Sequence, residues 1–203
     1  KEQPDYLAVA FDAGKPTFRH KQFAQYKAHR KPMPDRLIGQ LPLIKQLLAA
    51  YRIPVVQQEG FEGEDLLASL AKRIAPQGIE VFLVTGDKDA FQLVNSHVKV
   101  YNPHREPSVL DAEAVRARFG LAPEQMVDLM ALMGDQIDNI PGVPGIGEKT
   151  AIQLIQQFGT LERLYARLDE VDSASRRASL TAARQQVELA RTLVRIDDSV
   201  IQT

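Results

Sequence analysis

The chain has 203 residues and a mass of 22.6 kDa, enough for one large domain or two small ones with a substantial core. It contains no cysteine, which excludes a disulfide framework, a thiolate nucleophile and a zinc–thiolate site and favours a cytoplasmic location. No uncharged apolar stretch approaches the roughly 20 residues that span a bilayer, so no membrane partner is expected. The chain begins at Lys1 with no signal-peptide pattern, and we expect that an upstream segment precedes it.

The net charge of −1 hides an uneven distribution. Residues 1–60 carry ten Lys and Arg against five Asp and Glu, whereas residues 61–140 carry seven against thirteen. Within residues 15–36 there are seven cations and one acidic residue: Lys15, Arg19, Lys21, Lys27, Arg30, Lys31 and Arg36, with Asp35. This asymmetry is typical of a protein that holds a polyanion with one part and metal ions with another, although two solvated faces would also produce it.

Short apolar runs rich in β-branched and aromatic residues predict strands at residues 6–11, 53–57, 80–85 and 98–101. Helical spacing of leucine and isoleucine lies between them, at residues 37–48 and 66–74. Because strand and helix alternate, we expect an α/β fold with a mainly parallel sheet flanked by helices over residues 1–110.

After about residue 110 the pattern becomes helical. We expect helices at residues 111–119, 123–133 and about 149–158, and a single helix at residues 172–192. A Pro and Gly hairpin at residues 141–147 precedes the third of them. Residues 111–203 are therefore predicted to form a helical subdomain.

Acidic residues gather at four places along the chain. Asp12 follows the first predicted strand, and Asp87 and Asp89 follow the third, so these carboxylates are expected at the same edge of a parallel sheet. The other two groups are Glu62-Gly-Glu-Asp65 at a helix start and Asp135-Gln-Ile-Asp138. Taken alone, each group also suits helix capping or a turn.

So many carboxylates share one crevice only if cations neutralise them, because neighbouring like charges raise each other's pKa. An oxygen-only ligand set favours Mg²⁺ or Mn²⁺ over zinc. Two such ions roughly 4 Å apart stabilise the attacking and leaving oxygens of a phosphoryl displacement. Phosphodiester hydrolysis is therefore the chemistry that we expect first.

The glycine hairpin Pro141-Gly-Val-Pro-Gly-Ile-Gly-Glu-Lys-Thr150 has several interpretations. Glu148 separates the last glycine from Lys149, which argues against a Walker A loop, and no third glycine completes a dinucleotide fingerprint. In a helix-hairpin-helix, by contrast, the glycines let the backbone approach a DNA phosphate, and Lys149 and Thr150 add charge and a donor. A purely structural hairpin remains an alternative.

Five stretches together resemble the 5′-nuclease domain of bacterial DNA polymerase I, a relative of flap endonucleases and phage 5′ exonucleases. They are Phe11-Asp-Ala, Phe18-Arg-His-Lys with Tyr26-Lys-Ala-His-Arg30, Gly60-Phe-Glu-Gly-Glu-Asp65, Thr85-Gly-Asp-Lys-Asp-Ala-Phe-Gln-Leu93, and the run from Gly134 to Ala151. The resemblance covers nearly the whole chain in order. It implies a PIN-like core with a basic arch at about residues 15–36, and a helix-hairpin-helix at about residues 135–158.

The resemblance also implies the site residues. The ligands of a two-metal site would be Asp12, Glu62, Glu64, Asp65, Asp87, Asp89, Asp135 and Asp138. Lys27 and Arg30 would act at the scissile phosphate, and the DNA-binding residues would be Arg19, Tyr26, Lys27, Arg30, Gly142, Gly145, Gly147, Lys149 and Thr150. Tyr26 would stack on an unpaired base, and K⁺ would bind at the hairpin.

The resemblance implies a Mg²⁺-dependent or Mn²⁺-dependent 5′-3′ exonuclease and flap endonuclease of DNA replication and repair. Its partner would be DNA with a 5′ flap or 5′ single-stranded end, with a polymerase domain in the longer protein. A monomer at the bacterial nucleoid is expected. A small-molecule phosphohydrolase is a weaker alternative, because it would have little use for the basic segment or the hairpin.

Two departures from the family pattern stand out. The family usually has Glu-Ala-Asp-Asp where this chain has Glu62-Gly-Glu-Asp65, so Glu64 lengthens one ligand by a methylene. The family also begins with a strand ending in Asp-Gly, which would lie upstream of Lys1. The alternative function is therefore a catalytically weak or silent DNA-binding fragment.

Overall fold

The computed structural model describes residues 3–14, 16–104, 106 and 109–201. Lys15, one of the seven cations of the basic segment, lies outside these residues. The chain divides into two compact units, with the division inside one helix: the first unit comprises residues 1–70 and 197–203, and the second residues 71–196. The division at about residue 110, predicted from the change to a helical pattern, is not tested by this grouping and stays a prediction.

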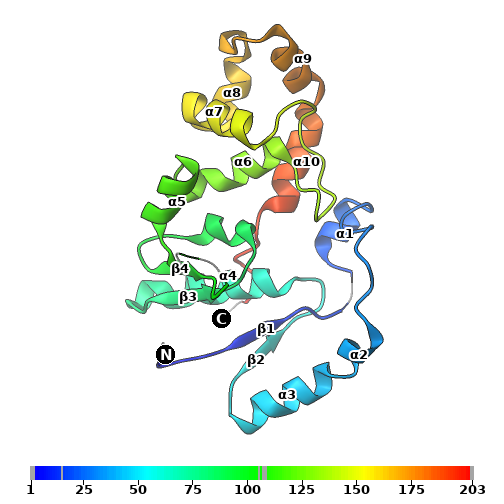
Figure 1. Cartoon of the computed structure of the whole chain (residues 1–203), viewed down its shortest axis with the longest axis vertical. Coiled ribbons are helices and arrows are strands. Elements are labelled where there is room, and N and C mark those ends of the chain that lie inside the picture. The colour runs from blue at the N-terminus through cyan, green and yellow to red at the C-terminus, as the bar shows by residue number, and fades with distance from the viewer. Residues whose placement is uncertain (1–2, 15, 105, 107–108, 202–203) are drawn as a thin grey trace. The chain divides into compact units, whose positions relative to one another are not determined.

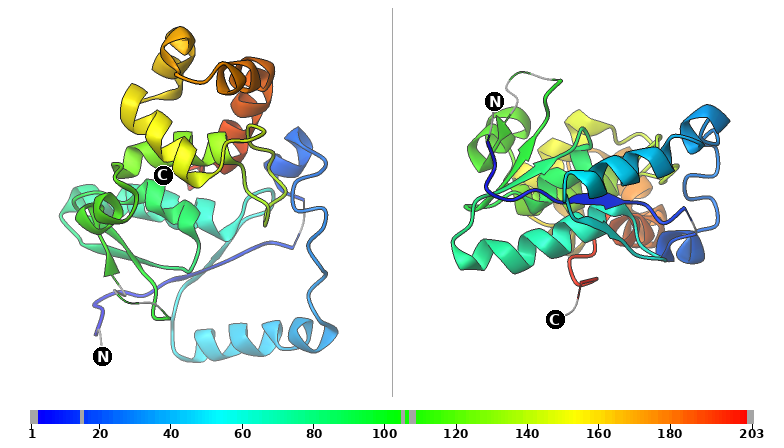
Figure 2. Two further views of the ribbon diagram at one scale, coloured as in Figure 1. Left: turned by 45° about the horizontal axis from the view of Figure 1, so that its top comes forward. Right: turned by 90° about the horizontal axis from the view of Figure 1, so that it is seen from below.

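The first unit is built on a pair of parallel strands. Strand β1 (Val9–Phe11) pairs with β2 (Val55–Gln57), and Val9 lies opposite Val55. Helices α1 (Phe18–Gln22), α2 (Asp35–Ile38) and α3 (Leu41–Ala50) lie between the two strands in the sequence. Helix α4 (Gly63–Ile74) follows β2 and carries the chain into the second unit (Figures 1 and 2).

The second unit opens with a three-stranded sheet. Strands β3 (Val81–Val84) and β4 (Val98–Tyr101) are parallel, and the short β5 (Val109–Leu110) pairs antiparallel with β4. The 3₁₀ segments η1 (Ala75–Gln77) and η2 (Lys88–Leu93) flank β3. The four predicted strands are thus confirmed, and each of the pairs β1–β2 and β3–β4 is parallel as expected. The described strands form two separate sheets, however, and not the single sheet that was predicted. Strand β5 was missed because it has only two residues.

The rest of the second unit is helical. Its elements are α5 (Ala112–Phe119), η3 (Pro123–Gln125), α6 (Met126–Met133), α7 (Glu148–Phe158), α8 (Leu161–Ala166), η4 (Leu168–Glu170), α9 (Ala174–Ala182) and α10 (Arg184–Val194). Helix α10 packs along α6 (Figure 1). The core of the second unit includes five completely buried side chains: Leu132, Ile155, Leu164, Leu180 and Val187. Among the described residues, no helix has the length and apolar character needed to cross a membrane.

The prediction of a single helix at residues 172–192 is wrong. The chain breaks at Ala183 into α9 and α10. The hydroxyl of Tyr165, on α8, donates to the Leu180 carbonyl, which is the acceptor that the Arg184 N–H would use in an uninterrupted helix. Helix α8 itself was not predicted, although Thr160 caps it by accepting a hydrogen bond from the Arg163 N–H.

Candidate metal and nucleic-acid site

In the first unit, Asp12 meets the start of α4. It lies directly after β1, and its Oδ1 accepts a hydrogen bond of 2.6 Å from the Gly63 N–H. Gln57, at the end of the neighbouring strand, donates to the Asp12 carbonyl at 2.8 Å. The parallel pairing of β1 and β2 therefore brings Asp12 beside the segment that contains Glu62 and Glu64. The strand-edge argument had instead placed Asp12 with Asp87 and Asp89 at one sheet edge, but β1 and β3 belong to different sheets.

Glu62 accepts contacts from three residues of the basic segment. The Tyr26 hydroxyl donates to Oε2 at 3.1 Å, and the Lys27 ammonium lies 2.8 Å from Oε1. Arg19 Nη1 is 3.7 Å from Oε2. Lys27 has a φ of +54°, in the left-handed region that non-glycine residues rarely adopt. This turn places the Tyr26 hydroxyl and the Lys27 ammonium on the same carboxylate.

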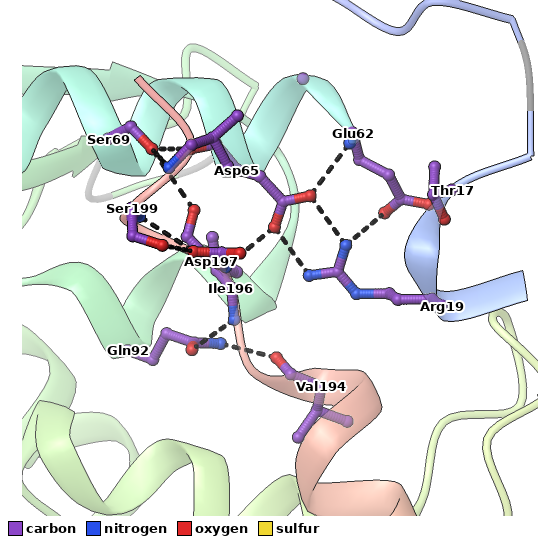
Figure 3. A network of polar contacts seen from close by, with 12 residues as sticks. Thr17, Arg19, Glu62, Asp65, Ser69, Gln92, Val194, Ile196, Asp197 and Ser199 are labelled. Carbon is purple, nitrogen blue, oxygen red and sulfur yellow. Dashed lines mark hydrogen bonds and ion pairs between the residues drawn. The ribbon is translucent and has the colours of Figure 1, made fainter. Parts of the chain in front are cut away.

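Arg19 and Asp65 form a buried two-pronged ion pair (Figure 3). Both guanidinium–carboxylate distances are 2.8 Å, and the exposed fractions are 3% for Arg19 and 0% for Asp65. Burial lowers the pKa of the Arg19 guanidinium, but the hydrogen bonds and charge of Asp65, with the charge of Glu62, raise it above its ordinary value. Arg19 is thus fully charged and held inside the protein.

Two predicted DNA contacts do not suit this arrangement. Arg19 was expected to grip a phosphate, but its guanidinium is buried and committed to Asp65. Tyr26 was expected to stack on a base, but it is only 2% exposed and its ring packs edge-on against His20 at 5.2 Å between centroids. In this conformation neither residue presents the group that its predicted role needs, whereas Arg30 is exposed.

In the second unit, a second acidic group surrounds Lys88. Its ammonium lies 2.9 Å from Asp135 Oδ2. Burial lowers the pKa of Lys88, and the hydrogen bond and charge of Asp135, with the charges of Asp89 and Asp87, raise it above its ordinary value. Conversely, burial raises the pKa of Asp135 and Lys88 brings it below its ordinary value. Lys88 therefore acts as an internal cation for these carboxylates.

A cavity of about 320 Å³ opens beside this group. Its lining includes Asp87, Lys88, Asp135, Asp138 and Arg118. The turn after β3 sets Asp87, whose Oδ1 accepts from the Asp89 N–H at 3.0 Å. Asp135 and Asp138 are each 8% exposed. The predicted carboxylates Asp87, Asp135 and Asp138 are thus brought together around one hollow.

A tight loop positions Asp135 and Asp138. Asp135 and Ile140 exchange two backbone hydrogen bonds of 2.8 and 2.7 Å, and Asp135 Oδ1 accepts from the Asp138 N–H at 3.2 Å. Gly134 and Gly142 lie back to back at the base of the loop. A Cβ on Gly134 would come within 2.3 Å of the Gly142 nitrogen, so neither position has space for a side chain.

The hairpin glycines differ in their surroundings. Gly142, predicted to contact DNA, packs against the Met133 carbonyl, and the structure thus gives it a packing role instead. A Cβ added at Gly145 or Gly147 would meet no atom within 4 Å, and Gly145 has a φ of +80°. They are exposed, as is Lys149 in the first turn of α7. An approaching phosphate thus finds open backbone and one cation there.

The donor set is composed of carboxylates, which are the ligands that hard divalent ions prefer. Among the described residues, no three His, Cys, Asp or Glu side chains already converge in the way a bound metal requires. The carboxylate ligand types fit a divalent metal. Lys27 and Lys88 form ion pairs with carboxylate oxygens that such an ion would use.

Comparison with known proteins gives consistent matches. Residues 1–120 match the model described as 5′-3′ exonuclease, N-terminal resolvase-like domain, and residues 121–202 match that of its C-terminal SAM fold. The chain is 45% identical over 199 residues to DNA polymerase I of Bacillus caldotenax and 42% identical over 196 residues to the thermostable DNA polymerase I of Thermus thermophilus. Each match covers 97% of this chain and 23% of the relative, so the chain spans about a quarter of these relatives' length.

Solved structures agree on the fold. A T5 5′-exonuclease with bound zinc has a TM-score of 0.82 at 23% identity, and the match covers 96% of this chain and 76% of that one. A T5 flap endonuclease described as a pseudo-enzyme–product complex with DNA and metal ions has a TM-score of 0.81 at 22% identity, covering 96% and 75%. The expected combination of a PIN-like core and a helical C-terminal part is confirmed.

Proposed function

The chain belongs to the 5′-3′ exonuclease family, and from this premise we propose that it is a divalent-metal-dependent nuclease acting on DNA near junctions of duplex and 5′ single strand. The observation that carries the proposal is the partial neutralisation of two carboxylate groups by lysines, Glu62 by Lys27 and Asp135 by Lys88. Carboxylates in such numbers need cations, and a phosphodiester is the substrate class that uses divalent ions in this way.

We propose that two Mg²⁺ or Mn²⁺ ions are held by seven of the eight predicted carboxylates: Asp12, Glu62, Glu64, Asp87, Asp89, Asp135 and Asp138. When bound, such ions activate water and neutralise charge on the phosphate. Lys27 and Arg30 would stabilise the negative charge that develops on the phosphate oxygens. Tyr26 would orient Glu62 through its hydroxyl, in place of the stacking role that its burial opposes.

We propose that the hairpin binds the duplex through its phosphate backbone. Gly145, Gly147, Lys149 and Thr150 would make these contacts, with K⁺ as an additional ligand of the hairpin. Contacts of this kind give affinity without base preference, because they carry no sequence information. Gly147→Ala should therefore weaken DNA binding while leaving the thermal unfolding midpoint (Tm) nearly unchanged, since its added methyl group meets no atom within 4 Å.

The wider setting is also part of the proposal. Because the relatives are DNA polymerases about four times longer, we propose that this chain works beside a polymerase domain in DNA replication and repair, as a monomer at the bacterial nucleoid. A 5′ flap or a 5′ single-stranded end would be its substrate.

The test is cleavage of an end-labelled 5′-flap duplex with Mg²⁺, with Mn²⁺ and with chelator. The Asp87→Ala/Asp89→Ala variant should lose at least about 100-fold in rate. Asp169→Ala/Asp172→Ala removes two exposed carboxylates of the same unit and is the matched control, with wild-type cleavage expected.

The outcomes separate three functions. Metal-dependent cutting near the junction that the first double variant abolishes supports the nuclease. Tight binding of the flap duplex without cutting would identify a DNA-holding module instead. Faster hydrolysis of a nitrophenyl phosphate ester than of DNA would favour a small-molecule phosphohydrolase.

A further inference from the structure

Asp65 differs from the other predicted ligands in how its oxygens are used. Oδ1 accepts hydrogen bonds from Arg19 Nη2 at 2.8 Å and from the Asp197 N–H at 2.9 Å. Oδ2 accepts from Arg19 Nη1 at 2.8 Å and from the Glu62 N–H at 2.9 Å. A carboxylate offers about four acceptor positions, and all four are taken in a side chain that is 0% exposed (Figure 3).

A metal ion could reach Asp65 only by breaking one of these bonds. Loss of an Arg19 contact would take a charged acceptor from a buried guanidinium, and loss of a backbone contact would take the acceptor from a partly buried N–H. Both cost more than the exchange of a partly exposed lysine, which is all that Glu62 or Asp135 requires. Direct ligation by Asp65 is therefore less favourable than ligation by Glu62 or Asp135.

The four bonds of Asp65 instead converge on the surroundings of Glu62. One fixes the Glu62 backbone, and two fix Arg19, whose Nη1 lies 3.7 Å from the Glu62 carboxylate. The fourth holds the segment that begins at Asp197, and Ser69, one helical turn beyond Asp65, accepts a second hydrogen bond from that segment through the Val200 N–H at 3.0 Å. Asp65 thereby fixes the Glu62 main chain through a direct hydrogen bond and the Glu62 side chain through Arg19.

We infer that Asp65 is a positioning residue, which orients Glu62 through Arg19 and through the first turn of α4 and contributes no ligand to the metal. The inference deepens the proposed nuclease function, and its catalytic readout rests on that function. Its stability and metal-binding readouts do not. Glu64, next to Asp65 in the same helical turn and partly exposed, provides the matched control because it belongs to the predicted ligand set.

The first measurement is thermal unfolding in chelator and with Mn²⁺, for Asp65→Asn, Glu64→Gln and the double variant Arg19→Gln/Asp65→Asn. We expect Asp65→Asn to lower the Tm in chelator by at least about 6 °C, because a buried charge loses its partner. The double variant should recover at least half of this loss and keep most of the Mn²⁺-induced rise in Tm. Glu64→Gln should lose much of the Mn²⁺-induced rise.

A ligand role for Asp65 predicts the opposite pattern. Asp65→Asn would then be as stable as the wild type in chelator or more so, and both Asp65 variants would lose the Mn²⁺-induced rise to the extent that Glu64→Gln does. That result overturns the inference. If the wild type neither binds Mn²⁺ nor cleaves DNA, the proposed function fails, but the unfolding series in chelator still decides whether Arg19 and Asp65 act as a pair.

The second measurement separates positioning from mere stabilisation. In the folded double variant, kcat on the 5′-flap duplex should fall at least tenfold while KM stays within twofold. The variant lacks the contacts that orient Glu62, and this orientation affects the chemical step but not DNA binding. A wild-type kcat would show a purely structural ion pair and would overturn the inference. Should the double variant not fold, Arg19→Lys keeps the charge without the two-pronged contact, and the same kcat criterion applies to it.

Discussion

The loop that carries Asp135 and Asp138 depends on two glycines, and Gly134→Ala tests this dependence directly. Gly134 has φ 71° and ψ −178°, a conformation that costs an alanine about 1–3 kcal/mol. The added Cβ would lie 2.3 Å from the Gly142 nitrogen and 2.6 Å from the Ile140 carbonyl oxygen. Relief of that overlap costs a further 1–3 kcal/mol or so, which gives about 4 kcal/mol in total.

For a protein of this size the loss corresponds to a fall in Tm of about 8–16 °C. The assay is thermal unfolding followed by circular dichroism, with Gly86→Ala as the control. A Cβ on Gly86 meets only the Asn102 amide nitrogen at 3.6 Å, an ordinary contact, so its Tm should stay within about 2 °C of the wild type. If Gly134→Ala unfolds at the same temperature as Gly86→Ala, the back-to-back packing of the glycines does not hold the loop.

Three further predictions concern charged groups of the second unit. Arg191→Met should cost about 3 kcal/mol of unfolding free energy by urea denaturation, because it leaves the buried Asp128, 2.9 Å from Arg191 Nε, without its ion pair; an unchanged urea midpoint would contradict this. Arg191 also hydrogen-bonds Glu162 and lowers its pKa from 4.5 to about 2, so the stability that Glu162 contributes is present above pH 4.5 and lost as the pH falls toward 2. The Tm difference between wild type and Glu162→Gln should accordingly shrink over that range, and a constant difference would refute it. Lys88→Met should lower the Tm in chelator and enlarge the Mn²⁺-induced rise, since Asp135 Oδ2 is then open to the ion; an unchanged rise would show that Lys88 does not compete.

The strands were predictable because their residues carry a local signal. β-branched and aromatic side chains mark β1 to β4, and the alternation with helices predicts parallel pairing. The break at Ala183 was not predictable in the same way. It coincides with a hydrogen bond from the Tyr165 hydroxyl to the Leu180 carbonyl. The sequence near Ala183 contains no glycine or proline that would indicate a helix break.

The same distinction between local and long-range contacts applies to the candidate site. The end of β1 was predicted correctly as the position of Asp12, but the sheet-edge argument paired Asp12 with Asp87 and Asp89, whereas the structure brings it to the start of α4. The burial of Arg19 was not foreseen, since a run of cations is usually solvated and its partner lies 46 residues away. The available signal was the small buried residues Ala68 and Ser69 beyond Asp65, which let other chain segments approach that face of α4 closely.

Two of the predicted carboxylate ligands, Glu62 and Asp135, are each paired with a lysine, and this affects how a divalent ion must bind there. Lys27 lies on Glu62 and Lys88 on Asp135, each within 2.9 Å, so the fold neutralises part of its acidic charge with its own side chains. Binding a divalent ion is then an exchange in which a lysine must leave, and the affinity is lower than the number of carboxylates suggests. A lysine released in this way is also a cation set free beside the metal ligands, where the phosphate of a DNA substrate would need one. The same two lysines can therefore stabilise the metal-free protein and contribute to the charge that receives the substrate.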